Sequence, residues 1–155
     1  MYCRNHQKVC GINFSLSNAV LLTPLPRFNV DLYHINDYHG AVAPLYLLPE
    51  VISVVLSLHN AEFQGLWSLR TPAEMDEICL VYNLEKGVVE EYVQYGEIFN
   101  LLHAAASYLR IHQKGFGAVG VSAKYGKRAF TRSLTTNFRV RTCSLLTDRT
   151  SQAKC

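Results

Sequence analysis

The stretch that decides the fold reads Val-Asp-Leu-Tyr-His-Ile at residues 30–35 and continues directly into Asn-Asp-Tyr-His-Gly at residues 36–40. The same pattern, a short apolar run that ends in polar residues, returns at residues 52–60 and again at residues 118–122. The lengths of these runs and their content of β-branched residues predict strands.

Helical patterns lie between the three runs. Residues 40–48 are apolar enough for a short helix that ends at Pro49. The sequence Thr-Pro-Ala-Glu at 71–74 is typical of a helix start, because Thr can cap, Pro suits the first helical position and Glu completes a capping box. A further helix is predicted over residues 85–95, and apolar side chains at helical spacing predict the strongest one over residues 97–112.

Strands that alternate with helices indicate βαβ units and a parallel sheet. The predicted fold class is therefore α/β, with a partial Rossmann-like parallel sheet. In such sheets ligands bind beyond the carboxyl ends of the strands. We expect that edge to carry the polar residues that follow the predicted strands, which are Asp37, His39, His59, Asn60 and Ser122.

Length and composition indicate a globular domain with a core. The chain has 155 residues, of which 49% are hydrophobic and 17% are charged, and a chain of this size is about one domain. Its five cysteines are scattered without a Cys-x-x-Cys pair, so neither a zinc motif nor a redox motif is predicted. A reducing compartment is the simplest interpretation.

Charge is distributed unevenly along the chain. Residues 1–127 carry 9 basic and 11 acidic side chains, whereas residues 128–155 carry 6 basic side chains and one acidic side chain. A basic tail can bind nucleic acid or a membrane surface, but we favour a solvated tail and expect no nucleic-acid partner. The longest apolar stretch, residues 41–58, is interrupted by two prolines and a glutamate, which excludes it as a membrane span.

Four stretches carry a family resemblance: DLYHINDYHGAVAPLYLLPE (31–50), LSLHNAEFQGLW (56–67), FNLLHAAASYLRIHQ (99–113) and VGVSAKYGKR (119–128). In order and spacing they resemble the glycogen/starch synthase catalytic domain, and the residues within them are similar to those of the fungal cell-wall α-1,3-glucan synthases. Because the resemblance is confined to the middle of the chain, we expect three parts. These are a divergent or poorly structured lead at 1–28, a partial catalytic domain at 29–130 and a basic, disordered tail at 131–155.

The resemblance implies the amino-terminal, acceptor-side half of a GT-B glycosyltransferase, in which two Rossmann-like domains face each other. It implies a retaining transfer of glucose from UDP-glucose to a growing α-glucan in cell-wall α-1,3-glucan synthesis, with no resident cofactor. The nucleotide-binding half is not recognisable in this sequence. Whether the chain alone is an enzyme therefore stays open, and the alternative is a non-catalytic glucan-binding remnant or a truncated inactive product.

Location also follows from the resemblance. The parent family implies the cytoplasmic side of the plasma membrane, with membrane attachment only through parts that this chain does not contain. Standing alone, the chain is expected to be soluble and cytoplasmic.

His39 and Asp37 are the predicted catalytic residues. By the resemblance, His39 lies beside the transferred sugar, where a neutral imidazole can hydrogen-bond a hydroxyl or the developing charge; the alternative is a histidine that caps a helix. Asp37 would either orient His39 or accept hydrogen bonds from backbone N–H groups at a helix start.

The predicted substrate-binding residues are His59, Asn60, Gln64, Ser122 and Tyr125. His59 and Asn60 can either reach the cleft or fix the loop that carries Gln64, and the sequence leaves this open. Ser122 has no paired base at a recognisable spacing, so it is not predicted to be a nucleophile.

Other candidates are weaker. Phe63, Leu66 and Trp67 could stack on a sugar, although such residues are more often part of the core. The spacing of the histidines fits no common zinc pattern, so no metal is expected. The glycine-rich run at 115–120 precedes a strand instead of following one, which excludes a dinucleotide-binding loop. His103 and His112, on the long predicted helix, are expected to be packed or surface residues.

Overall fold

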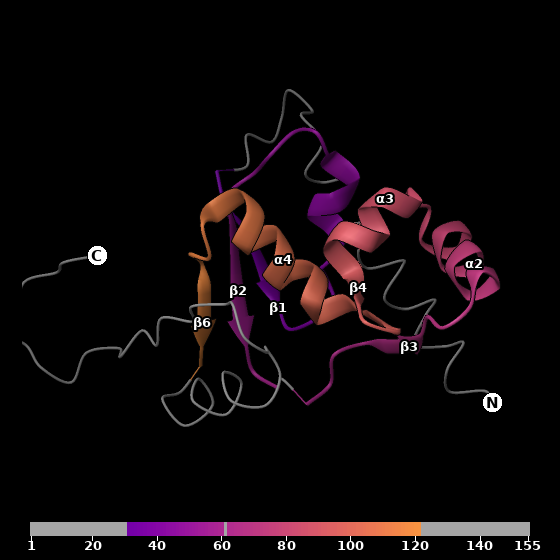
Figure 1. The fold of residues 1–155 in the computed structure, drawn as a ribbon. Coiled ribbons are helices and arrows are strands. Elements are labelled where there is room, and N and C mark those ends of the chain that lie inside the picture. Colours follow the sequence, from indigo (N-terminus) through magenta and orange to yellow (C-terminus); the bar gives the residue numbers. More distant parts are fainter. Residues whose placement is uncertain (1–30, 61, 122–155) are drawn as a thin grey trace, which may run out of the picture.

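A parallel sheet of three strands lies at the centre of the fold. The computed structural model describes residues 31–60 and 62–121, and the predictions for residues 1–28 and 131–155 fall outside this part. The strands are β1 (Tyr33–Asn36), β2 (Val54–Leu58) and β6 (Ala118–Gly120), in the order β1-β2-β6. Both pairings are parallel, as the sequence predicted. Figure 1 shows β1 and β2 running side by side in one direction.

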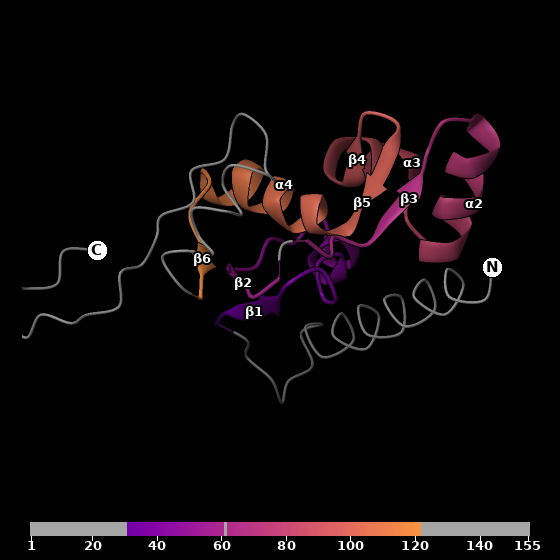
Figure 2. The same ribbon diagram turned by 90° about the horizontal axis from the view of Figure 1, so that it is seen from below.

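Helix α4 (Leu101–Gln113) covers one face of this sheet, as Figures 1 and 2 show. It begins after Asn100, whose side chain accepts a hydrogen bond from the backbone N–H of His103. Its last residue, Gln113, accepts a hydrogen bond from the N–H of Val54 at 2.6 Å and donates one to the carbonyl of Val54 at 2.9 Å. The helix therefore runs antiparallel to β2, with its first turn near the carboxyl ends of the strands.

A second, antiparallel sheet was not predicted. It consists of β3 (Leu66–Ser68), β5 (Ile98–Asn100) and β4 (Gln94–Tyr95), in the order β3-β5-β4. Because β5 occupies residues 98–100, α4 begins later than the predicted start at residue 97. Strands of two or three residues are too short to show a period of two, which is why the sequence pattern concealed them.

The remaining helices are α2, α3 and two short segments. Helix α2 (Pro72–Tyr82) confirms the predicted helix start. The helix predicted over 85–95 is shorter and consists of α3 (Lys86–Val88) and the π-helical η2 (Val89–Val93), which ends where β4 begins. The helix predicted over 40–48 is replaced by turns and the 3₁₀ helix η1 (Ala43–Leu47).

An aromatic cluster joins the second sheet to α2. The ring of Phe99 lies 5.4 Å from that of Trp67 and 4.8 Å from that of Tyr82, measured between centroids. All three side chains are buried. Trp67 is thus a core residue, whereas Phe63 and Leu66 are 63% and 51% exposed.

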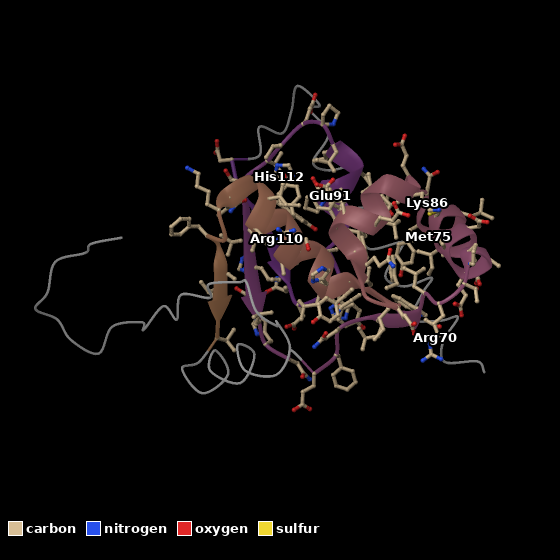
Figure 3. The ribbon with its side chains drawn as sticks, viewed as in Figure 1. Arg70, Met75, Lys86, Glu91, Arg110 and His112 are labelled. Carbon is tan, nitrogen blue, oxygen red and sulfur yellow. The ribbon has the colours of Figure 1, made fainter. Side chains whose placement is uncertain are left out.

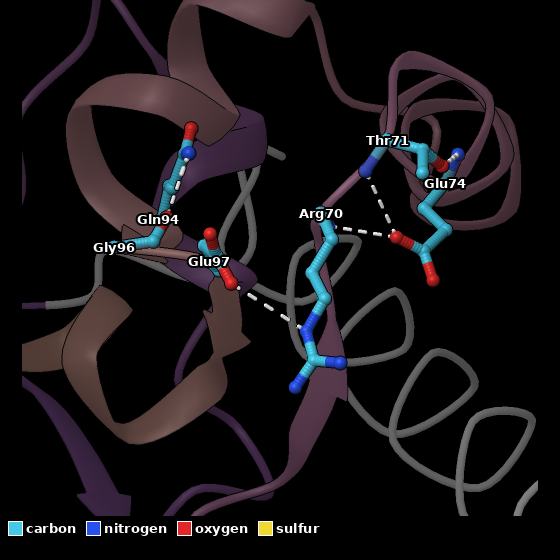
Figure 4. A network of polar contacts seen from close by, with 6 residues as sticks. All are labelled: Arg70, Thr71, Glu74, Gln94, Gly96 and Glu97. Carbon is cyan, nitrogen blue, oxygen red and sulfur yellow. Dashed lines mark hydrogen bonds and ion pairs between the residues drawn. The ribbon is translucent and has the colours of Figure 1, made fainter.

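Polar contacts at the start of α2 are shown in Figure 4. The hydroxyl of Thr71 accepts from the N–H of Glu74, and the carboxylate of Glu74 accepts from the N–H groups of Thr71 and Arg70. The hydrogen bond from the Arg70 backbone, followed by that from the Ser68 side chain, lowers the pKa of Glu74 below its ordinary value. The ion pair between Arg70 and Glu97 is exposed on both sides and adds little stability.

The capping box gives a first prediction. Thr71→Ala should lower the free energy of unfolding by about 1 kcal/mol, because the N–H of Glu74 loses its acceptor. Thr71→Ser keeps an acceptor oxygen in the same place and should be nearly neutral. Urea denaturation followed by circular dichroism measures both variants. A serine variant as unstable as the alanine variant would show that the cap does not contribute.

Candidate functional site

The carboxyl ends of the parallel strands meet at one edge of the sheet, as the sequence predicted. Strand β1 ends at Asn36 and leads into Asp37, and β2 ends at Leu58 and leads into His59. The N–H of Val121, just after β6, donates to the carbonyl of Leu58 at 3.3 Å. In Figure 1 this edge lies at the heads of the β1 and β2 arrows, where the chain leaves β2 toward β3.

Asp37 links the loops that follow β1 and β2. Its Oδ1 accepts from the backbone N–H of His59 at 2.8 Å and from that of Asn60 at 3.0 Å. Of its two predicted roles, the structure therefore shows the acceptance of backbone N–H groups. The partners, however, belong to the loop after β2 and not to a helix start. Asp37 itself has a positive φ of 52°, which asparagine and aspartate tolerate better than most residues.

His39 is exposed at the same edge. Its ring stacks on that of Tyr38, with centroids 4.1 Å apart and planes inclined by 24°. Turns occupy the chain from Asp37 to Val42, so no helix begins at His39 and the helix-cap alternative is wrong. An exposed imidazole at this edge is a polar group within reach of a ligand.

His59 and Asn60 make contacts that shape their loop. The Nε2 of His59 lies 3.1 Å from the Oδ1 of Asn36, and the Oδ1 of Asn60 accepts from the N–H of Glu62 at 3.3 Å. The second contact is an Asx-type turn. Of the two options left open by the sequence, these contacts support fixing of the loop.

Gln64 lies over the start of α4. Its side-chain Oε1 accepts from the Nδ2 of Asn100 at 2.8 Å, and its carbonyl accepts from the N–H of Leu102 at 3.1 Å. The carbonyl of Gly65 accepts from the N–H of Leu101 at 3.2 Å. Three N–H groups in the first turn of α4, those of residues 101–103, thus have partners within the chain. This helix terminus therefore does not present a set of free donors to a phosphate.

Ser122 and Tyr125, the other predicted substrate-binding residues, lie outside the described residues. The edge therefore brings together Asp37, His39, His59 and Asn60, with Gln64 at the adjoining end of the loop after β2.

Sequence reasoning missed Asn100. The predicted helix over 97–112 includes Asn100, but in the structure Asn100 is the N-cap of α4, is only 7% exposed and contacts a predicted site residue. The available signal was the residue type, because asparagine is a preferred N-cap and a weak former of helix interiors.

His103 in the first turn of α4 is packed, as predicted. Its Nε2 lies 3.1 Å from the hydroxyl oxygen of Ser107, and its ring centroid lies 5.2 Å from that of Tyr95. Burial lowers the pKa of His103, and the charge of Arg110 lowers it further. The imidazole is consequently neutral at pH 7.

A pocket of about 670 Å³ lies away from this edge. Its lining includes Tyr46, Glu91 and His112, the last of which is near the end of α4, as Figure 3 shows. The predicted site residues are thus arranged on an open edge and not inside this pocket. Within residues 31–60 and 62–121, no three His, Cys, Asp or Glu side chains are grouped so that they could hold a metal ion. None of the helices in this part of the chain has the length and apolar character needed to cross a membrane.

Sequence comparisons identify relatives along most of the chain. The sequence profile of the starch synthase catalytic domain matches residues 2–114. The chain is 61% identical over 122 residues to cell wall alpha-1,3-glucan synthase mok11 of Schizosaccharomyces pombe and 63% identical over 122 residues to ags1 of the same organism. It is also 30% identical over 108 residues to glycogen synthase of Vibrio cholerae, covering 62% of this chain and 21% of that enzyme.

The matches cover most of this chain but only a small part of the relatives. Each alignment to the two yeast proteins covers 79% of this chain but 5% of the relative, so the chain spans about a twentieth of their length. The profile match begins at residue 2, so it includes most of the predicted lead at 1–28.

A structural comparison agrees with the fold. The catalytic domain of starch synthase IV from Arabidopsis thaliana, bound to ADP and acarbose, is similar with a TM-score of 0.54 and 20% sequence identity. The match covers 76% of this chain and 23% of that chain. At this identity the likeness concerns the fold alone. It confirms the predicted class, a partial Rossmann-like α/β unit of the GT-B type.

Proposed function

The chain belongs to the starch synthase catalytic domain family, and from that membership we propose that it is the acceptor-side part of a retaining glucosyltransferase. The reaction is the transfer of glucose from UDP-glucose to a growing α-glucan, in the synthesis of α-1,3-glucan for a fungal cell wall. The observation that carries the proposal is the carboxyl edge of the sheet, where Asp37 holds the loop after β2 beside the exposed ring of His39.

The chemistry of this edge suits a neutral sugar. The loops after β1 and β2 offer imidazole, amide and carboxylate groups, which can donate to and accept from hydroxyls. The described residues contain four lysines and arginines, and none of them lies on these loops. The described part of the edge is therefore better suited to bind the hydroxyls of an acceptor glucan than the diphosphate of a nucleotide-sugar donor.

Roles within the site follow from these contacts. We assign the direct contact with the transferred sugar to His39, whose neutral form can hydrogen-bond a hydroxyl. Asp37 acts through the loop that it anchors. His59, Asn60 and Gln64 contribute polar groups along the path of the glucan, and Ser122 and Tyr125 are proposed to extend the site from the end of β6.

The remaining assignments concern the parent protein. Residues 29–130 are proposed as a partial acceptor-side domain, with a lead at 1–28 and a basic tail at 131–155. The partners are a nucleotide sugar and an α-glucan. The parent enzyme would work on the cytoplasmic side of the plasma membrane, attached through parts outside this chain.

A second candidate is a non-catalytic module that binds glucan without transferring glucose. It is favoured by the lack of basic side chains on the described loops of the edge and by the paired N–H groups at the start of α4. Binding of an α-linked glucose tetramer without glucosyl transfer from UDP-[14C]glucose would select this candidate for the isolated chain. Incorporation of label into the tetramer would select the enzyme.

The role of His39 can be tested directly. His39→Ala should leave the melting temperature nearly unchanged, because the side chain is exposed. It should raise the dissociation constant for an α-1,3-linked glucose tetramer roughly fivefold, since one hydrogen bond to the sugar is lost. NMR titration of the labelled chain measures the affinity.

The matched control is His34→Ala. His34 is also exposed and lies on β1, but its Nε2 lies 2.7 Å from the hydroxyl of Ser57 within the sheet. This variant should bind the tetramer as the parent chain does. If the His39 variant and the parent chain bound the tetramer with equal affinity, the contact assigned to His39 would be contradicted.

A further inference from the structure

The side chain of Asn100 uses both ends of its amide within the chain. Its Oδ1 accepts from the backbone N–H of His103 at 2.9 Å, which caps α4. Its Nδ2 donates to the Oε1 of Gln64 at 2.8 Å. Only 7% of the residue is exposed. A buried amide that lost either partner would leave a polar atom without compensation, so both bonds constrain its orientation.

These bonds place Asn100 at the junction of two elements. It is the last residue of β5 and the residue before α4, so its backbone is fixed on both sides. The carbonyls of Gln64 and Gly65 also accept from the first two N–H groups of α4. The backbone at residue 64 is therefore held by the helix, while its side chain is held by Asn100.

The other end of the same loop is held separately. Asp37 accepts the N–H groups of His59 and Asn60, where the loop leaves β2. Residues 59 and 60 are thus held by Asp37, and residue 64 is held by Asn100.

We propose that Asn100 is a positioning residue for the acceptor glucan, because it orients the side-chain amide of Gln64 toward the carboxyl edge. The inference rests on the proposed function, in which Gln64 contacts the sugar. Asn100 itself does not need to touch the glucan. Holding one rotamer of a long side chain before the ligand arrives reduces the entropy cost of binding.

Two variants separate this role from helix capping. Asn100→Ser keeps a capping oxygen for the N–H of His103, but its shorter side chain cannot reach Gln64. Asn100→Asp also caps, and a rotated Gln64 amide can donate to the carboxylate, so the contact is restored. Both variants should keep α4 folded, because serine and aspartate are good N-caps.

The first measurement is the mobility of the Gln64 side chain, from the heteronuclear NOE of its amide group in the full 155-residue chain. The Gln64 side chain should be equally ordered in the parent chain and in Asn100→Asp, and less ordered in Asn100→Ser, because that variant loses the contact with Asn100. Equal order in all three chains would overturn the inference, whatever the affinity for glucan.

The second measurement is the affinity for an α-1,3-linked glucose tetramer. We expect Asn100→Ser to raise the dissociation constant roughly fivefold, an effect of the size of one hydrogen bond, and Asn100→Asp to restore it. An unchanged affinity in a serine variant with a less ordered Gln64 would overturn the link to the glucan. A parent chain that binds no tetramer would contradict the proposed function, and this is distinct from the result on the order of Gln64.

Discussion

Replacing Phe99 by alanine is expected to lower the free energy of unfolding by about 3–5 kcal/mol, the usual cost of truncating a buried aromatic ring. Phe99 is fully buried, and its ring contacts those of Trp67 and Tyr82. The cavity would open between the second sheet and α2, since Phe99 is on the central strand β5. Because a small domain has a free energy of unfolding of only about 5–15 kcal/mol, this variant should lose a large part of its stability.

Ile98→Ala is the matched control for Phe99→Ala. Ile98 is next to Phe99 on β5 but faces the other side of the sheet and is 40% exposed. It should lose less than about 1 kcal/mol. Urea denaturation, monitored by the fluorescence of Trp67, measures both changes. Losses of similar size would show that the aromatic cluster is not the packed core of this region.

The central sheet and the longest helix could be predicted from the sequence because their signals are local. The three parallel strands lie in short apolar runs that end in polar residues, and α4 repeats apolar side chains at helical spacing over several turns. The start of α2 was predictable for the same reason, because its capping box occupies four consecutive residues. In each case the residues that determine the helix or strand lie within a few positions of one another.

The second sheet could not be predicted because its pairing is not local. Trp67 pairs with Phe99 across 32 positions of sequence, and neither strand is longer than three residues. The helical spacing of the apolar residues Ile98, Leu101 and Leu102 continues from β5 into α4, so the sequence pattern predicts one long helix. A break at Asn100 was visible only as a residue type that favours caps.

The candidate site could also be predicted only in part. That Asp37 and His59 share an edge followed from the rule that parallel strands bring their carboxyl ends together. The particular bond, from the backbone N–H of His59 to the carboxylate of Asp37, did not follow from the rule. Nor did the contact between Gln64 and Asn100, since it depends on where α4 begins.

Replacing Gly65 by alanine should be the most damaging change at the candidate site. Gly65 has a φ of +66°, a conformation that costs other residues about 1–2 kcal/mol. A Cβ atom there would lie 2.8 Å from the Cδ1 of Leu101 and 2.9 Å from the Cδ2 of Tyr38. Such close contacts add about 1–3 kcal/mol of strain, so the two effects together should cost about 2–5 kcal/mol. Because the ring of Tyr38 stacks on that of His39, relief of the clash should also displace His39 and weaken binding of the α-1,3-linked glucose tetramer.

Gly96→Ala separates backbone strain from the clash at Gly65. Gly96 has nearly the same φ, +60°, but a Cβ atom there would meet no atom within 4 Å. Gly96→Ala should therefore lose only the conformational part, about 1–2 kcal/mol, and should bind the tetramer as the parent chain does. If the two glycine variants lost equal stability, the close approach of Gly65 to Tyr38 and Leu101 would be contradicted. A Gly65 variant that is less stable but binds the tetramer normally would show that the position of Tyr38 does not control His39. The contact between His39 and the sugar would then not depend on the stacking of His39 on Tyr38.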